Sequence, residues 1–382
     1  MDLALYDPEV GYYARATQRS GRAGDFFTSV DVGPLFGELL EVQLAEMSEI
    51  LKKATAENAK NAEQCFLSAS SANSAVAFDL VEAGAGNGRL SADILRAARR
   101  RDRAFYDALR LHFVESSAAA RGAQRSTLAD VADRLVSSST DIPDSFEGVL
   151  IANELLDALP VHQVVMRDEG LKEIYVVARL FNGRDGREAE SLALGTIEGP
   201  PSTPELQEYL DRLHVELEPG WRVEINLRAV DWIRDAARRL RRGFIIVIDY
   251  GHEARELYSA THSSGTLTTY ASHRSMGPEP SIGVPVWLRN PGEQDLTTHV
   301  DFTSVRAAAE ADGMTTIALL DQTYFLLGLL PGLTNPQSAI RNPQYKTLML
   351  PGGLGSTHKV MILGKGVGAP ALSGCSFKVR VT

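Results

Sequence analysis

Hydrophobic positions along the chain follow two spacings, one typical of strands and one typical of helices. Short apolar runs suit buried strands, whereas apolar residues that recur every three or four positions suit amphipathic helices. In the first part of the chain the two patterns alternate, which indicates a parallel sheet in a doubly wound α/β fold. The predicted elements are a strand at 78–82, a helix at 90–101, a strand at 111–115, a helix at 117–135 and a strand at 148–152.

The pattern changes after residue 160, where the predicted strands no longer alternate with helices. A loop rich in Gly, Glu and Pro reaches Pro204, and the stretch 251–300 shows no regular pattern. Loops of that length in a compact protein are usually functional or disordered. The predicted elements of this part are strands at 161–166 and 172–180, a helix at 228–241 and a very hydrophobic strand at 244–249.

The N-terminal region is rich in glycine and aromatic residues as far as about Pro34, and an amphipathic helix is predicted at 35–51. Residues 52–75 consist mainly of Ala, Asn, Ser and Glu with little apolar periodicity, so we expect an inserted mobile linker. The predicted organisation is a cover segment and helix at 1–51, the linker at 52–76, the first part of the core at 77–160, a substrate-binding insertion at 161–227, and the core completion with a long site loop and C-terminal strands at 228–382.

Composition and charge exclude several classes of protein. The 382 residues are 44% hydrophobic and 23% charged, as in an ordinary soluble globular protein. The net charge of −10 argues against nucleic acid as the main partner. Cys65 and Cys375 are the only cysteines and stand far apart, so neither a disulfide framework nor a metal site is expected. Without a signal peptide or an apolar run of membrane length, no membrane insertion is expected, and a bacterial protein of this kind would be cytoplasmic.

A glycine-rich segment between Phe78 and Leu90 carries the strongest functional signal. The predicted strand ends at Glu82, and Gly84, Gly86 and Gly88 follow at alternate positions before a helix begins. Bare backbone at such a turn allows a ligand to approach closely, and the free N–H groups of a helix start suit an anionic group. The third glycine follows the second after one residue, Asn87, so the spacing differs from the dinucleotide fingerprint. The observed glycine spacing is typical of S-adenosylmethionine sites, although a structural turn without a ligand remains the alternative.

The second predicted strand strengthens the cofactor hypothesis. It also ends in a carboxylate, Glu115, at the position where a ribose-binding acid is expected after the glycine motif. A carboxylate can accept hydrogen bonds from both ribose hydroxyls. The alternative is an ordinary solvated acid at the end of a strand.

Several short motifs in a fixed order, along nearly the whole chain, are similar to those of one family. They are found at 4–8, 11–13, 24–29, 35–38, 82–88, Glu115, 152–162, 249–251, 295–302 and 355–363. On these motifs the chain resembles the MidA-type methyltransferases, which include the mitochondrial arginine methyltransferase needed for assembly of respiratory complex I. Members of that family usually have further residues before the first motif, so we expect an N-terminal helix to be missing here.

The resemblance implies a class I, Rossmann-like methyltransferase core with an added substrate-binding subdomain. S-adenosylmethionine would be the cofactor, and the acceptor would be an arginine of a protein substrate such as a respiratory-complex subunit. It also implies that 24–29 folds over the cofactor as a lid. The residues assigned to cofactor binding are Asp25, Thr28, Glu82, Gly84, Gly86, Asn87, Gly88, Glu115 and Asn153.

Methyl transfer from a sulfonium needs alignment and desolvation more than covalent help from the protein. Glu154 follows the strand at 148–152, where the fold would face it toward the methyl group. Glu154 and Asp157 are three residues apart and would share one face of a helix, so we assign them to a clamp on the guanidinium. The alternative is that Asn153 and Asp157 only cap a helix after that strand.

His299 and Asp301 are the candidates for an oriented general base, in which the carboxylate holds the imidazole. A single histidine in a long loop is more often structural or solvated, and only the family motif favours a catalytic role. The four catalytic candidates are therefore Glu154, Asp157, His299 and Asp301.

Two rival functions remain open at this stage. A small-molecule O-methyltransferase on the same core would need a base, so His299 with Asp301 would be essential and Glu154 less so. A cofactor-binding assembly factor without turnover would keep Glu82, Gly86 and Glu115 but would transfer no methyl group.

Overall fold

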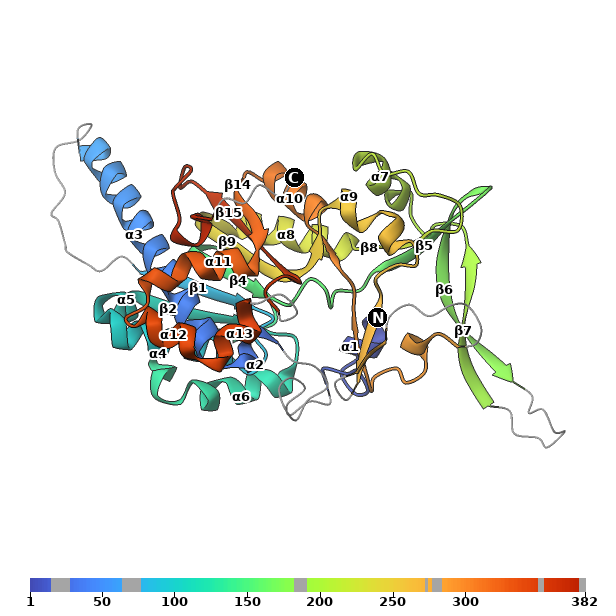
Figure 1. Cartoon of the computed structure of the whole chain (residues 1–382), viewed down its shortest axis with the longest axis horizontal. Coiled ribbons are helices and arrows are strands. Elements are labelled where there is room, and N and C mark those ends of the chain that lie inside the picture. Colours follow the sequence, from blue (N-terminus) through green and yellow to red (C-terminus); the bar gives the residue numbers. More distant parts are fainter. Residues whose placement is uncertain are drawn as a thin grey trace. The chain divides into compact units, whose positions relative to one another are not determined.

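The computed structural model describes residues 1–14, 28–63, 77–181, 191–271, 274–276, 284–349 and 354–377 (Figure 1). Two compact units, each built from separate stretches of the chain, make up the fold. The first unit comprises Met1–Phe26, Leu156–Asp231 and Gly251–Val305, and the second comprises Phe27–Leu155, Trp232–Tyr250 and Arg306–Thr382. The segment boundaries expected from the sequence remain a prediction.

The second unit is built on a mostly parallel sheet. Strands β3, β2, β1, β4 and β9 run parallel in that order, and β15 and β14 complete the sheet in antiparallel fashion. This arrangement confirms the predicted α/β fold class. The strands are β1 (Phe78–Ala83), β2 (Leu109–Val114), β3 (Leu135–Ser139), β4 (Phe146–Asn153), β9 (Leu240–His252), β14 (Thr315–Asp321) and β15 (His358–Lys365).

The direction in which successive strands are added reverses at β1, which lies between β2 and β4. In open α/β sheets, ligands bind beyond the carboxyl ends of the strands at such a reversal. The register aligns these ends, because Ala83 of β1 pairs with both Val114 of β2 and Ala152 of β4. The loops that follow the three strands therefore start at one edge of the sheet.

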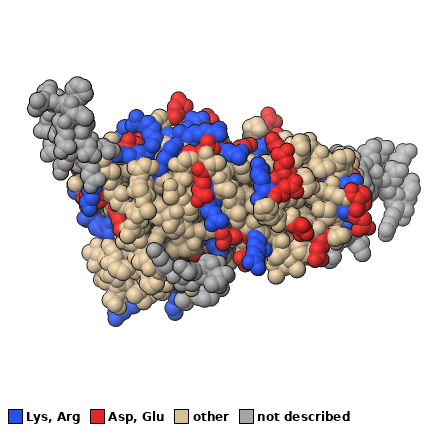
Figure 2. Space-filling view, turned by 90° about the horizontal axis from the view of Figure 1, so that it is seen from above, with Lys and Arg blue, Asp and Glu red and all other residues tan. Residues whose placement is uncertain are grey.

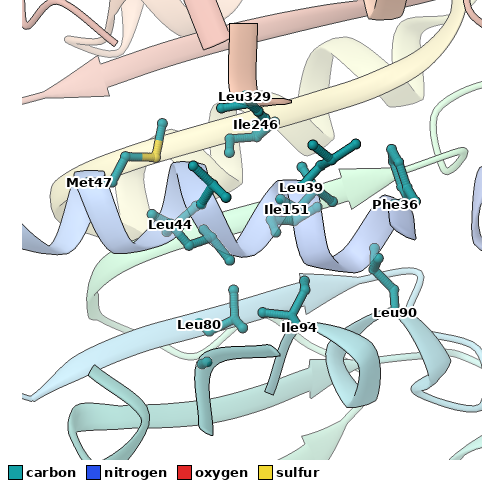
Figure 3. Packing of buried hydrophobic residues seen from close by; sticks show 14 of the residues in the cluster. Phe36, Leu39, Leu44, Met47, Leu80, Leu90, Ile94, Ile151, Ile246 and Leu329 are labelled. Carbon is teal, nitrogen blue, oxygen red and sulfur yellow. The ribbon is translucent and has the colours of Figure 1, made fainter. Parts of the chain in front are cut away.

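Helices surround this sheet, and the long helix α3 supplies much of its core. In Figure 3, Leu39, Leu44 and Met47 of α3 lie among side chains of the sheet and its neighbouring helices, including Ile151 and Ile246. The helices with residues in this unit are α2 (Ser29–Val32), α3 (Leu35–Glu63), α4 (Arg89–Arg101), α5 (Arg103–Ala108), α6 (Ala118–Leu128), η1 (Ala129–Arg134), α8 (Leu227–Arg239), α10 (Phe302–Ala311), α11 (Gln322–Leu329), η4 (Leu330–Gly332), α12 (Pro336–Arg341), α13 (Pro343–Met349) and η5 (Ser373–Cys375).

The first unit contains two small antiparallel sheets, one ordered β7-β6-β5-β8 and the other β11-β10-β12. A short strand, β13, pairs with residues 251–252 at the end of β9. The elements of this unit are α1 (Asp2–Tyr6), β5 (His162–Arg167), β6 (Gly170–Phe181), β7 (Ser191–Gly199), α7 (Glu205–Arg212), β8 (Arg222–Ile225), α9 (Ala254–Leu257), η2 (Ala260–His262), β10 (Thr268–Ala271), β11 (Arg274–Met276), η3 (Val286–Leu288), β12 (Asp295–Thr297) and β13 (Val300–Asp301).

Three expectations about secondary structure were wrong in part. Helix α3 continues to Glu63 through half of the expected linker, because Ala, Lys and Glu are strong helix formers even without an apolar face. The helix expected at 117–135 ends at Leu128, where Ala129 adopts a φ of 46°, and a short 3-10 helix and β3 follow. The stretch 251–300 contains several short helices and strands, whose few residues give too little periodicity to detect.

The face of the molecule drawn in Figure 2 carries both acidic and basic side chains. Within the described ranges, no helix is both long enough and apolar enough to cross a membrane.

The packing of α3 generates a first prediction. Replacing the fully buried Leu39 with alanine should lower the free energy of unfolding by about 2–5 kcal/mol, because it removes apolar contacts and leaves a cavity. Ile340→Ala, at a position of α12 that is 43% exposed, is the control and should lower the free energy of unfolding clearly less than Leu39→Ala does. Urea unfolding followed by circular dichroism measures both, and equal effects would contradict the assigned core.

Candidate functional site

The glycine loop after β1 adopts a backbone that side chains disfavour. Gly84, Gly86 and Gly88 have φ values of +69°, +51° and +82°, all in the left-handed region. A Cβ on Gly88 would meet Phe113 at 2.7 Å, and one on Gly84 would meet Leu155 at 3.1 Å, so packing explains these two glycines. A Cβ on Gly86 would meet no atom within 4 Å. Gly86 therefore presents bare backbone to open space, as a ligand-binding turn requires.

Glu82 is buried at the end of β1 and is tied to the first turn of α4. Its Oε2 accepts a 3.2 Å hydrogen bond from the Ser91 N–H and another from the Ser91 hydroxyl. Burial raises the pKa of the Glu82 carboxyl to about 7, although the bonds from Ser91 act in the opposite direction. The side chain thus joins strand to helix beneath the glycine loop, and its contact with a cofactor remains a prediction.

Glu115 fixes the backbone of the glycine loop from the end of β2. Its Oε2 accepts a 2.7 Å hydrogen bond from the Gly86 N–H, and its Oε1 accepts one of 2.7 Å from the Ser117 N–H. The opposite side of the loop is held by Gln124, whose amide donates to the Gly86 carbonyl at 2.9 Å and accepts from the Ser138 hydroxyl at 2.6 Å. A carboxylate has about four acceptor positions, so Glu115 keeps capacity for ribose hydroxyls.

Glu154, directly after β4, has an unusual conformation for a non-glycine residue, with a φ of 51°. Its N–H donates to the Ile248 carbonyl at 2.8 Å. Its Oε1 accepts from the Ser29 N–H at 3.2 Å and the Asn153 amide at 3.3 Å, and lies 3.5 Å from Nε2 of His358. Such strain costs on the order of 1–3 kcal/mol and persists where the surroundings enforce it, commonly at functional sites.

His358 is the ionisable neighbour of this carboxylate and was not identified from the sequence. The ring is fully buried at the start of β15, and its Nδ1 lies 2.8 Å from the Leu354 carbonyl. Burial alone lowers the pKa of His358, but the adjacent Glu154 carboxylate more than offsets this, so the pKa is raised. A lone histidine within the motif at 355–363 gave no sign of this contact, which depends on the pairing of β15 with β9.

The end of β9 completes the surroundings of Glu154. Asp249 is fully buried, and its Oδ2 accepts a 3.1 Å hydrogen bond from the Leu155 N–H. The ring of Tyr250 lies against that of His358, with centroids 3.9 Å apart. Asp249 therefore fixes the backbone next to Glu154.

The predicted lid falls mostly outside the described residues, and Asp25 is among those not described. Thr28 is described, and both its N–H and its hydroxyl bond to Oδ2 of Asp31, at 3.1 and 2.9 Å. Asp31 in turn pairs with Arg89 at 3.0 Å. Thr28 is thus held at the start of α2, and its role toward a cofactor remains a prediction.

The expected helical face for Glu154 and Asp157 was wrong. Residues 154–160 form bends and turns without a helix, because Glu154 takes a left-handed conformation and Pro160 follows closely. Asp157 is buried in the first unit, where its backbone carbonyl accepts from the Thr298 N–H at 2.9 Å. Because no helix begins after β4 here, neither the helical argument for the clamp nor helix capping by Asp157 and Asn153 applies.

The expected pair of His299 and Asp301 is also not formed. Oδ2 of Asp301 accepts from the hydroxyls of Tyr209 at 2.7 Å and Ser304 at 2.6 Å, while Oδ1 accepts from the Thr303 N–H at 2.9 Å. The carboxylate therefore caps the start of α10, and no hydrogen bond to His299 is found in the described part of the chain.

His299 lies instead beside two other histidines. Its ring centroid is 5.2 Å from that of His252 and 5.8 Å from that of His262. Burial lowers the pKa of His299 to about 4, and the two neighbouring rings add to this effect. His299 is therefore neutral at physiological pH, and a base of such low pKa is poorly matched to proton removal near pH 7.

Comparison with known proteins gives a consistent result. A family model described as "Putative S-adenosyl-L-methionine-dependent methyltransferase" matches residues 62–320. Protein arginine methyltransferase NDUFAF7 of Mus musculus is 28% identical over 85% of this chain and 68% of its own length, and the homologue of Drosophila melanogaster is 28% identical over 82% and 66%. The family resemblance stated from the motifs is confirmed.

A crystal structure from Burkholderia thailandensis, with bound S-adenosyl-homocysteine, has a TM-score of 0.78 and 25% identity, covering 98% of this chain and 89% of that one. Both curated relatives are named as mitochondrial proteins. This contradicts the cytoplasmic localisation expected from the sequence, which rested only on missing targeting features.

The buried Glu82 predicts a pH dependence of stability. Its folded-state pKa of about 7 exceeds the ordinary value of 4.5, so the folded protein binds the proton more tightly. The tighter proton binding stabilises the folded protein by about 3 kcal/mol. This contribution to the free energy of unfolding is fully present below pH 4.5 and is lost as the pH rises through 7.

Glu82→Gln should therefore give a flatter dependence of unfolding free energy on pH between 4.5 and 7 than wild type. Urea unfolding at several pH values measures this, with the exposed Glu49→Gln as a control that should parallel wild type. If the Glu82→Gln profile also ran parallel to wild type, the assigned burial would be wrong.

Proposed function

Because the chain belongs to the family of S-adenosyl-L-methionine-dependent methyltransferases, we propose that it transfers a methyl group to an arginine side chain of a protein substrate. The acceptor is inferred from the relatives, which are named protein arginine methyltransferases. The observation that carries the proposal is the strained Glu154, fixed at the edge of the sheet where the loops after β1, β2 and β4 begin.

The residues around the glycine loop fit the cofactor of the family. The open side of Gly86 accepts a ligand against the main chain, and Glu115 retains acceptor capacity for two ribose hydroxyls. When bound, S-adenosylmethionine supplies a methyl group that is already activated by its sulfonium. The protein must then bind, orient and exclude water, for which a loop fixed by Glu115 and Gln124 is suited.

Glu154 is proposed to bind the guanidinium. Within the described part of the chain, Ser29, Asn153 and His358 all contact Oε1 of its carboxylate, and Oε2 accepts no hydrogen bond there. A guanidinium keeps its proton at neutral pH and donates from a planar fork, so a carboxylate oxygen can fix one of its nitrogens in place. We assign His358 and Asn153 as positioning residues, because both hold Oε1 and leave Oε2 for the substrate.

The role of Asp157 as a second substrate contact remains part of the proposal, although the helical argument for it fails. The O-methyltransferase alternative is weaker, since its reaction requires a base. Asp301 caps α10 and does not support His299. A respiratory-complex subunit as acceptor is proposed on the names of the relatives alone.

Cofactor binding is tested at Gly86. Gly86→Val should weaken binding of S-adenosyl-homocysteine by at least a hundredfold, because the side chain would occupy the open face of the loop and disfavour a φ of +51°. The matched control is Gly122→Val on α6, where an added Cβ also meets nothing within 4 Å. Isothermal titration calorimetry measures both, and unchanged affinity in Gly86→Val would reject the loop as the cofactor site.

Catalysis is tested at Glu154. The purified protein is incubated with methyl-labelled cofactor and a lysate of its own source, and labelled bands are examined by mass spectrometry for methylated arginine. Glu154→Gln should lower transfer by two orders of magnitude or more while leaving affinity for S-adenosyl-homocysteine within about threefold, because the clamp acts on the acceptor. Glu49→Gln serves as the control for the substitution itself.

The outcomes separate the three functions. Label in protein arginine, lost in Glu154→Gln, supports the proposal. Label found only in the organic extract would favour an O-methyltransferase. Binding of cofactor without any transfer would favour an assembly factor, and equal loss of binding and transfer in Glu154→Gln would count against the clamp.

A further inference from the structure

The first unit brings together three histidines that are far apart in the sequence. His252 lies at the end of β9, His262 ends η2, and His299 lies between β12 and β13. One ring nitrogen of each lies within 4.8 Å of the corresponding atoms of the other two. The cluster is partly exposed, and none of its three histidines is assigned to the methyl-transfer site proposed above.

A single residue, Glu256 in α9, orients two of the three rings. Its backbone carbonyl lies 3.0 Å from Nδ1 of His262, and its carboxylate Oε1 lies 3.0 Å from Nδ1 of His252. Both contacts are made at Nδ1 of the ring. Histidines that bind metals are almost always held this way, with the second ring nitrogen donating to a carboxylate or a backbone carbonyl.

His299 contributes a buried ring nitrogen to the cluster. Its Nδ1 has no hydrogen-bond partner in the described ranges, whereas its backbone N–H donates to the Thr266 hydroxyl at 3.0 Å. An unsatisfied buried polar atom costs about 1–3 kcal/mol. Ring packing alone does not explain the cluster, because apolar rings would pack without the cost of this unsatisfied nitrogen.

We propose that His252, His262 and His299 bind a divalent transition metal, with Zn²⁺ as the best match, and that the carboxylate of Glu256 supports the site. Three imidazoles favour Zn²⁺ and its neighbours over Mg²⁺ and Ca²⁺, which prefer oxygen ligands. A zinc ion lies about 2.0–2.1 Å from each nitrogen that binds it. The three ring nitrogens lie within 4.8 Å of one another, so an ion placed centrally among them would be no more than about 2.8 Å from each. Small side-chain movements therefore complete the coordination.

The metal would link three segments of the first unit. It would join the end of β9, the turn at η2 and the loop before β13, and so restrain the long stretch between residues 251 and 300. A metal that binds only the folded form raises its stability according to the ratio of free metal to the dissociation constant. The cysteine count gave no hint of such a site, because it uses histidines alone.

The test uses the full chain without a histidine tag, after removal of metals by chelation. Wild type should bind one Zn²⁺ per chain by calorimetry and by elemental analysis after dialysis, and Co²⁺ should give the visible absorption of a nitrogen-liganded, low-coordinate ion. His262→Gln and His299→Gln should each weaken Zn²⁺ binding at least a hundredfold, and Glu256→Gln about tenfold. His214→Asn, at an exposed histidine outside the cluster, is the control and should bind as wild type does.

Far-UV circular dichroism and affinity for S-adenosyl-homocysteine show whether each variant is folded, so loss of metal is separated from loss of structure. The proposal would be overturned if wild type bound no Zn²⁺ at micromolar concentrations. Unchanged stoichiometry and affinity in the two ligand variants would also overturn it, since the metal would then bind adventitiously elsewhere.

Discussion

The parallel register of β1 with β2 and β4 is the constraint on which the candidate site depends. Because Ala83 pairs with both Val114 and Ala152, the chain leaves the three strands at one level. The glycine loop, Glu115 and Glu154 follow these strand ends directly. The side chain of Glu115 then fixes the Gly86 N–H, so the geometry of the loop depends on the neighbouring strand as well as on its glycines.

Strands β9 and β15 also help to position Glu154 at this edge of the sheet. Its left-handed backbone is secured by the Ile248 carbonyl of β9, and its carboxylate is held by Ser29 and by His358 of β15. Elements from three separate regions of the chain therefore fix this one residue. A general acid or base needs a suitable pKa, but a clamp needs a fixed position, and a strained, braced carboxylate suits the second role better.

Features encoded locally were predictable from the sequence, and features that arise from pairing of distant segments were not. The strand ends at Glu82 and Glu115 and the alternate glycines are local patterns, and the structure places them at one edge of a parallel sheet. His358 and Gln124 were missed because their partners are brought to them only by the fold. The expected pair of His299 and Asp301 failed for the same reason, since Tyr209 and Ser304 bind the carboxylate instead.

The most direct test of this account is a crystal structure of the protein grown with S-adenosyl-homocysteine. We predict that the ligand lies along the backbone of residues 84–88, with both ribose hydroxyls bonded to Glu115 and its sulfur on the side of Glu154. A ligand bound elsewhere, or a loop at 84–88 closed by protein atoms while the ligand is present, would contradict the account.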